Sequence, residues 1–211
     1  AEKASSLRKN YSIDVRLCAV TNSKKMLFAE DGQSLVFDKE NLLKHGAPLD
    51  LNVFIEKMQV LNLPNTVFVD CTASDDVPKF YEKILNASIS IVTPNKKANS
   101  GSYAQYHLLK ETARLRGVKF LYETNVGAGL PVINTLDGLL LSGDIVVQIE
   151  AVLSGTLSYL FNTFDGTKPF STLVSEARQL GYTEPDPRDD LCGIDVARKL
   201  LILTREMGLQ L

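Results

Sequence analysis

The sequence has little of what marks secreted, zinc-binding or membrane proteins. It holds only three cysteines, Cys18, Cys71 and Cys192, which lie far apart and form no CxxC pair. Because only His45 and His107 are present to complete a zinc site, no structural zinc is expected, and a reducing cytoplasm is the expected setting. No apolar run approaches the roughly 18 residues of a membrane span, and the opening AEKASSLRKN lacks the apolar core of a signal peptide.

An excess of either charge is also lacking. Lys and Arg number 23 and Asp and Glu number 25, which gives a net charge of −2 with both signs spread along the chain. Because no basic stripe is present, neither nucleic acid nor an anionic membrane is expected as a partner. What remains is a chain of 211 residues, 45% of them hydrophobic, which is long enough for one large or two modest domains.

Short apolar runs alternate with longer amphipathic ones in the first part of the chain. Four runs rich in β-branched residues are typical of strands buried on both faces, at 15–20, 66–71, 88–93 and 118–123. Helical patterns lie between them at 51–61, 75–86 and 101–116, and the last ends at Gly117, which suits a helix C-terminus. This alternation predicts an α/β fold with a parallel sheet and right-handed crossovers.

The pattern changes after Val126. A helix is expected to begin near Pro131, followed by one longer strand at 144–154 and then by three helical segments. We therefore expect two domains, 1–130 and 131–211, packed directly on each other because no flexible linker separates them.

The predicted sheet is incomplete for a dinucleotide-binding domain of the Rossmann type. Such a domain opens with a strand, a GxGxxG turn and a helix, but only fourteen residues precede the first predicted strand and none is glycine. The chain also stops directly after a helix. We expect either a truncated chain or a sheet completed in another way.

The nearest glycine motif, NVGAGLPV at 125–132, is a weak dinucleotide fingerprint because Val132 occupies the third glycine position. Two interpretations stay open. One is a tight turn in which Gly127 and Gly129 adopt positive φ. The other is a turn whose backbone carbonyls face a ligand or a cation.

Two further motifs follow predicted strands, where ligands bind in open parallel sheets. TPNKKA places Asn95, Lys96 and Lys97 at the rim of a cleft, although a solvated turn explains the two lysines equally well. CTAS offers Thr72 to a cofactor or merely caps the next helix.

The stretch GYTEPDPRDDLCGIDVARK at 181–199 is crowded with acids. EPDPRDD alone contains four carboxylates, which repel one another unless cations or substrate amines lie among them. Asp195 and Lys199 are four apart on a predicted helix, and in isolation an exposed ion pair explains them. Crowded carboxylates beside a lysine suit a site for an amino-bearing substrate, and they also suit a divalent metal, so both classes stay open.

Together, YETNVGAGLPVI, TPNKKA and GYTEPDPRDDLCGIDVARK closely resemble homoserine dehydrogenase, in the form fused behind an aspartate kinase. The resemblance covers about residues 12–211. It implies reversible hydride transfer between L-homoserine and L-aspartate 4-semialdehyde with NAD or NADP. It also implies a partial Rossmann-like sheet, followed by an α+β domain for substrate binding and dimerisation, in a homodimer or a higher homo-oligomer.

The resemblance assigns roles within the acid-rich stretch. Lys199 matches the acid/base lysine, and neighbouring carboxylates favour its protonated form and hence the acid role in aldehyde reduction. Glu184 and Asp195 match substrate-binding positions, while Asp189 and Asp190 shape the substrate pocket.

The resemblance also implies cofactor and cation sites. Lys96 matches the lysine at the junction of cofactor and substrate, with both a catalytic and a cofactor-binding role. The other cofactor positions are Thr72, Thr21, Asn22 and Gly181. A monovalent cation, usually sodium, is held largely by backbone carbonyls around Glu123, Val126, Ala128 and Leu130.

Two departures from the family qualify this assignment. The pyrophosphate turn and the returning C-terminal portion of the nucleotide domain are absent, so we expect this stretch alone to bind cofactor poorly and to be weakly active or inactive. The alternatives are a non-catalytic, dimerising fragment of the same enzyme and a divalent-metal hydrolase.

Overall fold

The computed structural model describes residues 3–29, 39–184 and 186–211. Internal contacts divide the chain into two compact units, Ala1–Thr66 and Val67–Leu211, which we call the first and second unit. The predicted domain boundary near residue 130 falls inside the second unit and stays a prediction.

The first unit contains a small antiparallel sheet with helices. Its elements are α1 (Ala4–Tyr11), β1 (Ala19–Thr21), β2 (Lys25–Phe28), α2 (Lys39–His45), β3 (Ala47–Pro48) and α3 (Leu51–Leu61). The strand order is β1-β2-β3, and both pairings are antiparallel. Helix α3 matches the helix predicted at 51–61, and Asp50 caps its first turn by accepting hydrogen bonds from the amides of Asn52 and Val53.

The prediction that 15–20 forms a strand of the parallel sheet is wrong. Only Ala19–Thr21 is a strand, and it pairs with β2 in the opposite direction. The reason is Asn22, whose side-chain oxygen accepts hydrogen bonds from the amides of Lys24 and Lys25, so the chain reverses at once. A turn this short joins antiparallel strands, whereas parallel strands need a longer crossover.

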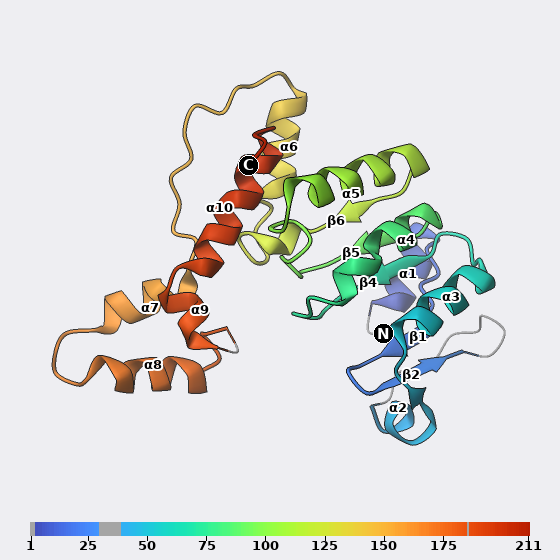
Figure 1. The fold of residues 1–211 in the computed structure, drawn as a ribbon, viewed down its shortest axis with the longest axis horizontal. Coiled ribbons are helices and arrows are strands. Elements are labelled where there is room, and N and C mark those ends of the chain that lie inside the picture. Colours follow the sequence, from blue (N-terminus) through green and yellow to red (C-terminus); the bar gives the residue numbers. More distant parts are fainter. Residues whose placement is uncertain (1–2, 30–38, 185) are drawn as a thin grey trace. The chain divides into compact units, whose positions relative to one another are not determined.

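The second unit holds the predicted parallel sheet (Figure 1). Its first part consists of β4 (Val67–Val69), the 3-10 helix η2 (Val77–Phe80), α4 (Tyr81–Asn86), β5 (Ser90–Val92), α5 (Tyr103–Arg116), β6 (Phe120–Leu121) and the 3-10 helix η3 (Glu123–Asn125). The order is β4-β5-β6 with both pairings parallel, which confirms the strands predicted at 66–71, 88–93 and 118–123. Helix α5 ends at Gly117 with φ 66°, as predicted.

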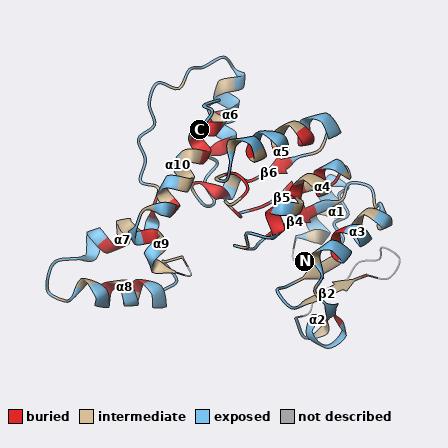
Figure 2. Ribbon diagram, viewed as in Figure 1, coloured by how far each residue is buried: buried red, intermediate tan, exposed pale blue. Residues whose placement is uncertain are grey.

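The core of the first part of this unit lies between the sheet and its helices (Figure 2). The fully buried side chains are Ile91 on β5, Tyr81, Ile84 and Leu85 on α4, and Leu109 on α5. The helix predicted at 75–86 instead begins at Val77 as a 3-10 turn containing Pro78, and only Tyr81–Asn86 is α-helical.

The second part of this unit is helical. Its elements are α6 (Ile133–Leu141), α7 (Gly155–Thr163), α8 (Phe170–Gln179), α9 (Pro187–Leu191) and α10 (Ile194–Glu206). Among the described residues, four helices therefore follow residue 154, where three were predicted. Figure 1 shows α10 extending from α9 to α6, and α10 contacts both of these helices. Among the described helices, none is long and apolar enough to cross a membrane.

The strand predicted at 144–154 is also wrong for the described residues. The segment runs from α6 to α7 without regular structure and with its side chains largely exposed, Val147 and Val152 among them at 94% and 83%. A β-branched sequence becomes a strand only where a neighbouring strand accepts its hydrogen bonds, and within the described residues none pairs with this segment.

Candidate active site

A buried polar network fixes the loop that follows β5, residues 93–102, which we call the β5–α5 loop. The Asp70 side chain, at the end of β4, accepts a hydrogen bond from the Tyr81 hydroxyl at 2.5 Å and one from the Asn95 side-chain amide at 3.1 Å. Asn95 also donates to the carbonyl of Ser74, and Thr93 donates to the carbonyl of Asp70. Burial raises the pKa of Tyr81 most, and the hydrogen bond to Asp70 raises it further, so the phenol stays neutral and donates.

The backbone of Lys96 is held within this loop. Its carbonyl accepts hydrogen bonds from the amides of Asn99 at 3.1 Å and Ser100 at 2.9 Å, and from the Ser100 hydroxyl at 2.8 Å. The β5–α5 loop therefore presents Lys96 from a defined turn. Because the side chain of Lys96 is only 21% exposed and is ion-paired, the interpretation as a solvated turn is wrong for this lysine. Its neighbour Lys97 instead pairs with Asp75, whose side chain is largely exposed, at 3.0 Å.

Helix α10 supplies the second half of the site. Gly193 precedes it with φ 76°, and Asp195 and Lys199 occupy its first two turns. The Lys199 ammonium lies 2.6 Å from Asp195 Oδ2 and donates to the Leu153 carbonyl at 2.7 Å. Because Asp195 is only 5% exposed, the interpretation as an exposed ion pair is wrong.

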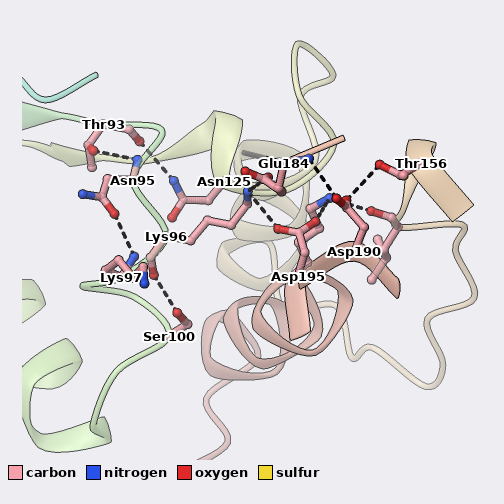
Figure 3. A network of polar contacts seen from close by, with 12 residues as sticks. Thr93, Asn95, Lys96, Lys97, Ser100, Asn125, Thr156, Glu184, Asp190 and Asp195 are labelled. Carbon is pink, nitrogen blue, oxygen red and sulfur yellow. Dashed lines mark hydrogen bonds and ion pairs between the residues drawn. The ribbon is translucent and has the colours of Figure 1, made fainter. Parts of the chain in front are cut away.

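Lys96 and Lys199 share the carboxylate of Asp195. Lys96 Nζ lies 3.0 Å from Asp195 Oδ1 and 3.3 Å from Glu184 Oε1 (Figure 3). Glu184 belongs to the segment between α8 and α9, which we call the acid loop, so the β5–α5 loop, α10 and the acid loop meet at one ammonium group. Two carboxylates and two ammonium groups thus form a partly buried cluster with alternating charge.

The charges in this cluster stabilise one another. Burial opposes the charge on Lys96, but hydrogen bonds and attraction from Asp195 and Glu184 outweigh it, so the pKa of Lys96 is raised. Burial likewise opposes ionisation of Asp195, but the hydrogen bonds from Lys199 and Lys96 outweigh it and lower its pKa. At neutral pH, Lys96 is protonated and Asp195 is ionised.

Asp190 holds the backbone of the acid loop. It is 3% exposed, and its Oδ2 accepts a hydrogen bond from the amide of Glu184 at 2.8 Å. Its Oδ1 lies 2.8 Å from the hydroxyl of Thr156 on α7, as Figure 3 shows. Asp190 therefore links the backbone of Glu184 to α7. It influences the position of the Glu184 carboxylate, which faces Lys96, only through that backbone.

Asp186 and Asp189 lie apart from this cluster. Asp186 caps α9 through the amide of Arg188 and forms an ion pair with its guanidinium at 2.6 Å. The hydrogen bond from the Arg188 side chain, and to a smaller extent the one from its amide, lower the pKa of Asp186 to about 2. The carboxylate of Asp189 makes no hydrogen bond or ion pair with the described residues, so the structure gives it no contact with the cluster.

The predicted cofactor positions fall in different places. Thr72 follows β4, with its amide bonded to Asp70 and its hydroxyl 3.5 Å from the Asn95 side chain, which places it beside the β5–α5 loop. Gly181 follows α8 with φ 76°. Thr21 and Asn22 belong to the first unit, where both bond within the turn between β1 and β2.

The glycine turn confirms one predicted conformation and corrects another. Gly127 has φ 80°, and a Cβ there would lie 2.5 Å from Val132 Cγ2, so only glycine fits. The second positive φ belongs to Ala128, at 51°, and not to Gly129. The amide of Leu130 donates a hydrogen bond to the carbonyl of Gly127, and this closed turn holds Ala128 in the left-handed region of backbone conformation.

Among the predicted cation ligands, Glu123 uses its side chain elsewhere. Its carboxylate accepts hydrogen bonds from the amides of Ile133 and Asn134 and so caps α6. Within the described residues, the carbonyls of Val126 and Ala128 accept no hydrogen bond, which fits a role as cation ligands. No three His, Cys, Asp or Glu side chains of the described chain are grouped as in a side-chain metal site.

Sequence reasoning missed the contribution of α7. Ser154 caps this helix, Thr156 anchors Asp190, and the preceding carbonyl of Leu153 binds Lys199. The pair Ser154–Gly155 is a readable helix start, but the strand predicted through residue 154 concealed it.

Comparison with known proteins identifies the family. The sequence model for the homoserine dehydrogenase NAD-binding domain matches residues 2–123, and the homoserine dehydrogenase model matches residues 131–211. The chain is 48% identical over 206 residues to a chloroplastic bifunctional aspartokinase/homoserine dehydrogenase of maize, Zea mays. That match covers 97% of this chain but only 22% of the maize protein.

Two solved structures share the fold. A Candida auris protein of unknown function is 37% identical, with a TM-score of 0.80, over 98% of this chain and 60% of its own. A hyperthermophilic archaeal homoserine dehydrogenase in complex with NADPH is 23% identical, with a TM-score of 0.78, over 97% of this chain and 65% of its own. The chain therefore belongs to the homoserine dehydrogenase family.

Proposed function

We propose that the protein carrying this chain interconverts L-homoserine and L-aspartate 4-semialdehyde with NAD or NADP. Family membership supports the reaction, and the observation that carries it here is the cluster of Lys96, Asp195 and Lys199. Reduction of an aldehyde needs a hydride and a proton, and this cluster provides a partly buried ammonium group as the proton source.

Lys199 is the proton donor in this proposal. Asp195 and the Leu153 carbonyl fix two directions around its ammonium group. A third N–H is left to point at the substrate, because an ammonium group has three donors. A nicotinamide cofactor, when bound, would supply the hydride, and Lys199 gives its proton to the aldehyde oxygen as negative charge develops there. In the reverse direction, Lys199 takes the hydroxyl proton back.

The acid loop binds the amino acid. Glu184 is 39% exposed at its side chain, and it pairs with Lys96 through one oxygen, so its carboxylate is available to a substrate ammonium group. Asp195 acts at the hydroxyl end of the substrate indirectly, by holding the Lys199 ammonium group. Lys96, protonated between these carboxylates, adds positive charge at the junction of substrate and cofactor.

The cofactor is expected at the carboxyl ends of β4 and β5, where ligands bind in open parallel sheets. Thr72 and Lys96 lie on the loops that follow these strands, and Gly181 lies beside the acid loop. The archaeal relative was solved with NADPH.

A monovalent cation and self-association complete the proposal. The carbonyls of Glu123, Val126, Ala128 and Leu130 are the proposed ligands, because the positive φ of Gly127 and Ala128 folds this turn on itself. A homodimer or a higher homo-oligomer in a reducing compartment is proposed from the family.

The test compares Lys199→Met with Lys97→Met, because Lys97 is a matched lysine of the same unit outside the cluster. The assay is NADPH oxidation with L-aspartate 4-semialdehyde, in the longest natural chain that contains this sequence. We expect Lys199→Met to lower kcat by about 10²–10⁴-fold, as for loss of a general acid, and Lys97→Met to leave it nearly unchanged.

Other outcomes would separate the alternatives. A folded wild-type protein without this activity and without nicotinamide binding would support the structural, dimerising role. Hydrolytic activity abolished by EDTA would support a divalent-metal hydrolase. Equal activity of Lys199→Met and the wild type would overturn the proposed role of Lys199.

A further inference from the structure

Arg205, in the last turn of α10, is a buried arginine that pairs with no Asp or Glu side chain among the described residues. It is 4% exposed. Its Nη1 donates to the carbonyl of Asn99 at 2.7 Å and its Nη2 to the carbonyl of Gly101 at 2.7 Å. Its Nε and Nη2 also donate to the carbonyl of Leu211, at 2.9 and 2.7 Å, and the guanidinium lies near the ring of Tyr106, 5.4 Å from its centroid.

The residues that Arg205 binds belong to the β5–α5 loop, which carries Lys96. The amide of Asn99 donates to the carbonyl of Lys96, while the carbonyl of Asn99 accepts from Arg205. The path from Arg205 to the backbone of Lys96 therefore contains two hydrogen bonds and one residue.

Two anchors hold this loop from opposite ends. Asn95 ties the start of the loop to the sheet through Asp70 and Ser74. Arg205 ties the end of the loop to α10, the helix that also bears Asp195. The second anchor joins the main chain of the loop to the opposite half of the active site, in addition to the ion pairs that the Lys96 side chain makes with Asp195 and Glu184.

The Lys96–Asp195 pair is poorly suited to set this spacing alone. A lysine has a flexible four-carbon stem, whereas a guanidinium is a rigid planar fork that binds two acceptors in fixed directions. All three acceptors of the guanidinium, the carbonyls of Asn99, Gly101 and Leu211, are backbone atoms. The bonds to Asn99 and Gly101 therefore locate the main chain of the loop relative to the helix.

We propose that Arg205 is a positioning residue, which holds the β5–α5 loop against α10 so that the Lys96 ammonium stays between Asp195 and Glu184. Arg205 touches no reacting atom in this account. The inference rests on the proposed function for its kinetic consequence, although the geometry that it predicts can be tested separately.

Glu206, the next residue, offers a matched control. Its side chain is also buried, at 4% exposed, and it accepts hydrogen bonds from Tyr106, Tyr122 and Lys110. These partners lie on α5 and next to β6, not on the β5–α5 loop. A Glu206→Gln variant therefore disturbs a buried polar contact at the same end of α10 without releasing the loop.

The kinetic test uses Arg205→Lys and Glu206→Gln in the longest natural chain, below the unfolding transition of each variant. We expect Arg205→Lys to lower kcat by about 10- to 100-fold, because small misplacements of a reacting constellation cost rates of this size. Glu206→Gln is expected to lower Tm with kcat unchanged. In a Lys96→Met background, Arg205→Lys should cause little further loss.

A second readout does not need activity. Acetylation of lysines followed by peptide mass spectrometry gives the labelling rate of Lys96 relative to Lys97. We expect this ratio to rise in Arg205→Lys and to stay at the wild-type value in Glu206→Gln. A wild-type protein without dehydrogenase activity would sink the proposed function, while the labelling ratio would still decide the role of Arg205. An unchanged ratio, or equal kcat losses in both variants, would overturn the inference.

Discussion

Two pairs of acids from the same short stretch have different surroundings. Asp190 and Asp195 are almost fully buried, and each makes two or more polar contacts within the second unit. Asp186 and Asp189 are only partly buried, and the carboxylate of Asp186 is bonded to its near neighbour Arg188. A carboxylate is costly to bury unless it is paired and hydrogen-bonded. The buried pair therefore shows where the fold holds charged groups in a fixed arrangement.

Removal of the Asp195 carboxylate is expected to have the largest effect. Asp195→Ala leaves Lys96 and Lys199, with side chains 21% and 17% exposed, facing each other without their shared counter-charge. We expect a loss of about 3 kcal/mol in the free energy of unfolding, together with loss of activity. Denaturant unfolding monitored by circular dichroism measures the first effect. A loss below about 0.5 kcal/mol, typical of surface changes, would show that the cluster is not coupled as described.

The same contribution is expected to depend on pH in a defined direction. The pKa of Asp195 is lowered from its ordinary value of 3.8, so its stabilising contribution is present above that value and lost as pH falls through the lowered pKa. The pKa of Lys96 is raised from 10.5, so its contribution is present below that value and lost as pH rises through the raised pKa. The stability difference between the wild type and Asp195→Asn should therefore be flat around neutral pH and shrink at both extremes. A difference that grows on acidification contradicts this account.

Asp190→Asn should have an intermediate effect. The variant keeps the shape but loses the charge that accepts the amide of Glu184, and hydrogen bonds to charged groups contribute about 1.5–3 kcal/mol. We expect the free energy of unfolding to fall by about 1.5–3 kcal/mol. We also expect a higher KM for the amino-acid substrate, because the backbone of Glu184 is released. Thr156→Val, which removes the contact to the other oxygen, serves as the companion variant. An unchanged KM in both variants would separate Asp190 from the substrate site.

The smallest effect is expected at Asp189. Its carboxylate has no bonded partner within the described residues, so Asp189→Asn should change stability by no more than about 0.5 kcal/mol. Thermal unfolding and steady-state kinetics of this variant provide the check. A large rise in KM would instead place Asp189 in the substrate pocket, as the family resemblance predicts.

The sequence predicted the parallel sheet because its strands are short, β-branched and separated by helix-length segments. Periodicity also placed Asp195 and Lys199 on one helix face, and the structure confirms their contact. Burial of that pair was not predictable, because it depends on Lys96 arriving from a distant loop. The local sequence pattern cannot predict a contact between residues that lie far apart in the chain, on the loop after β5 and on α10.

Two errors have the same origin. The segments 15–20 and 144–154 have the composition of strands, but strand formation depends on a partner. At the first, Asn22 forms a tight turn that gives an antiparallel partner. At the second, the described residues provide no partner strand, and the assumed strand concealed the start of α7.

The most direct test of the central claim is substrate binding by two isosteric variants from the two acid pairs. Calorimetric titration of L-homoserine, with NADP present, would be compared among the wild type, Asp195→Asn and Asp189→Asn in the longest natural chain. The account predicts that Asp195→Asn weakens binding by about tenfold or more, equivalent to about 1.4 kcal/mol, while Asp189→Asn binds as the wild type does. Equal affinities of the two variants would contradict the claim that the buried Asp195 belongs to the substrate site and Asp189 does not.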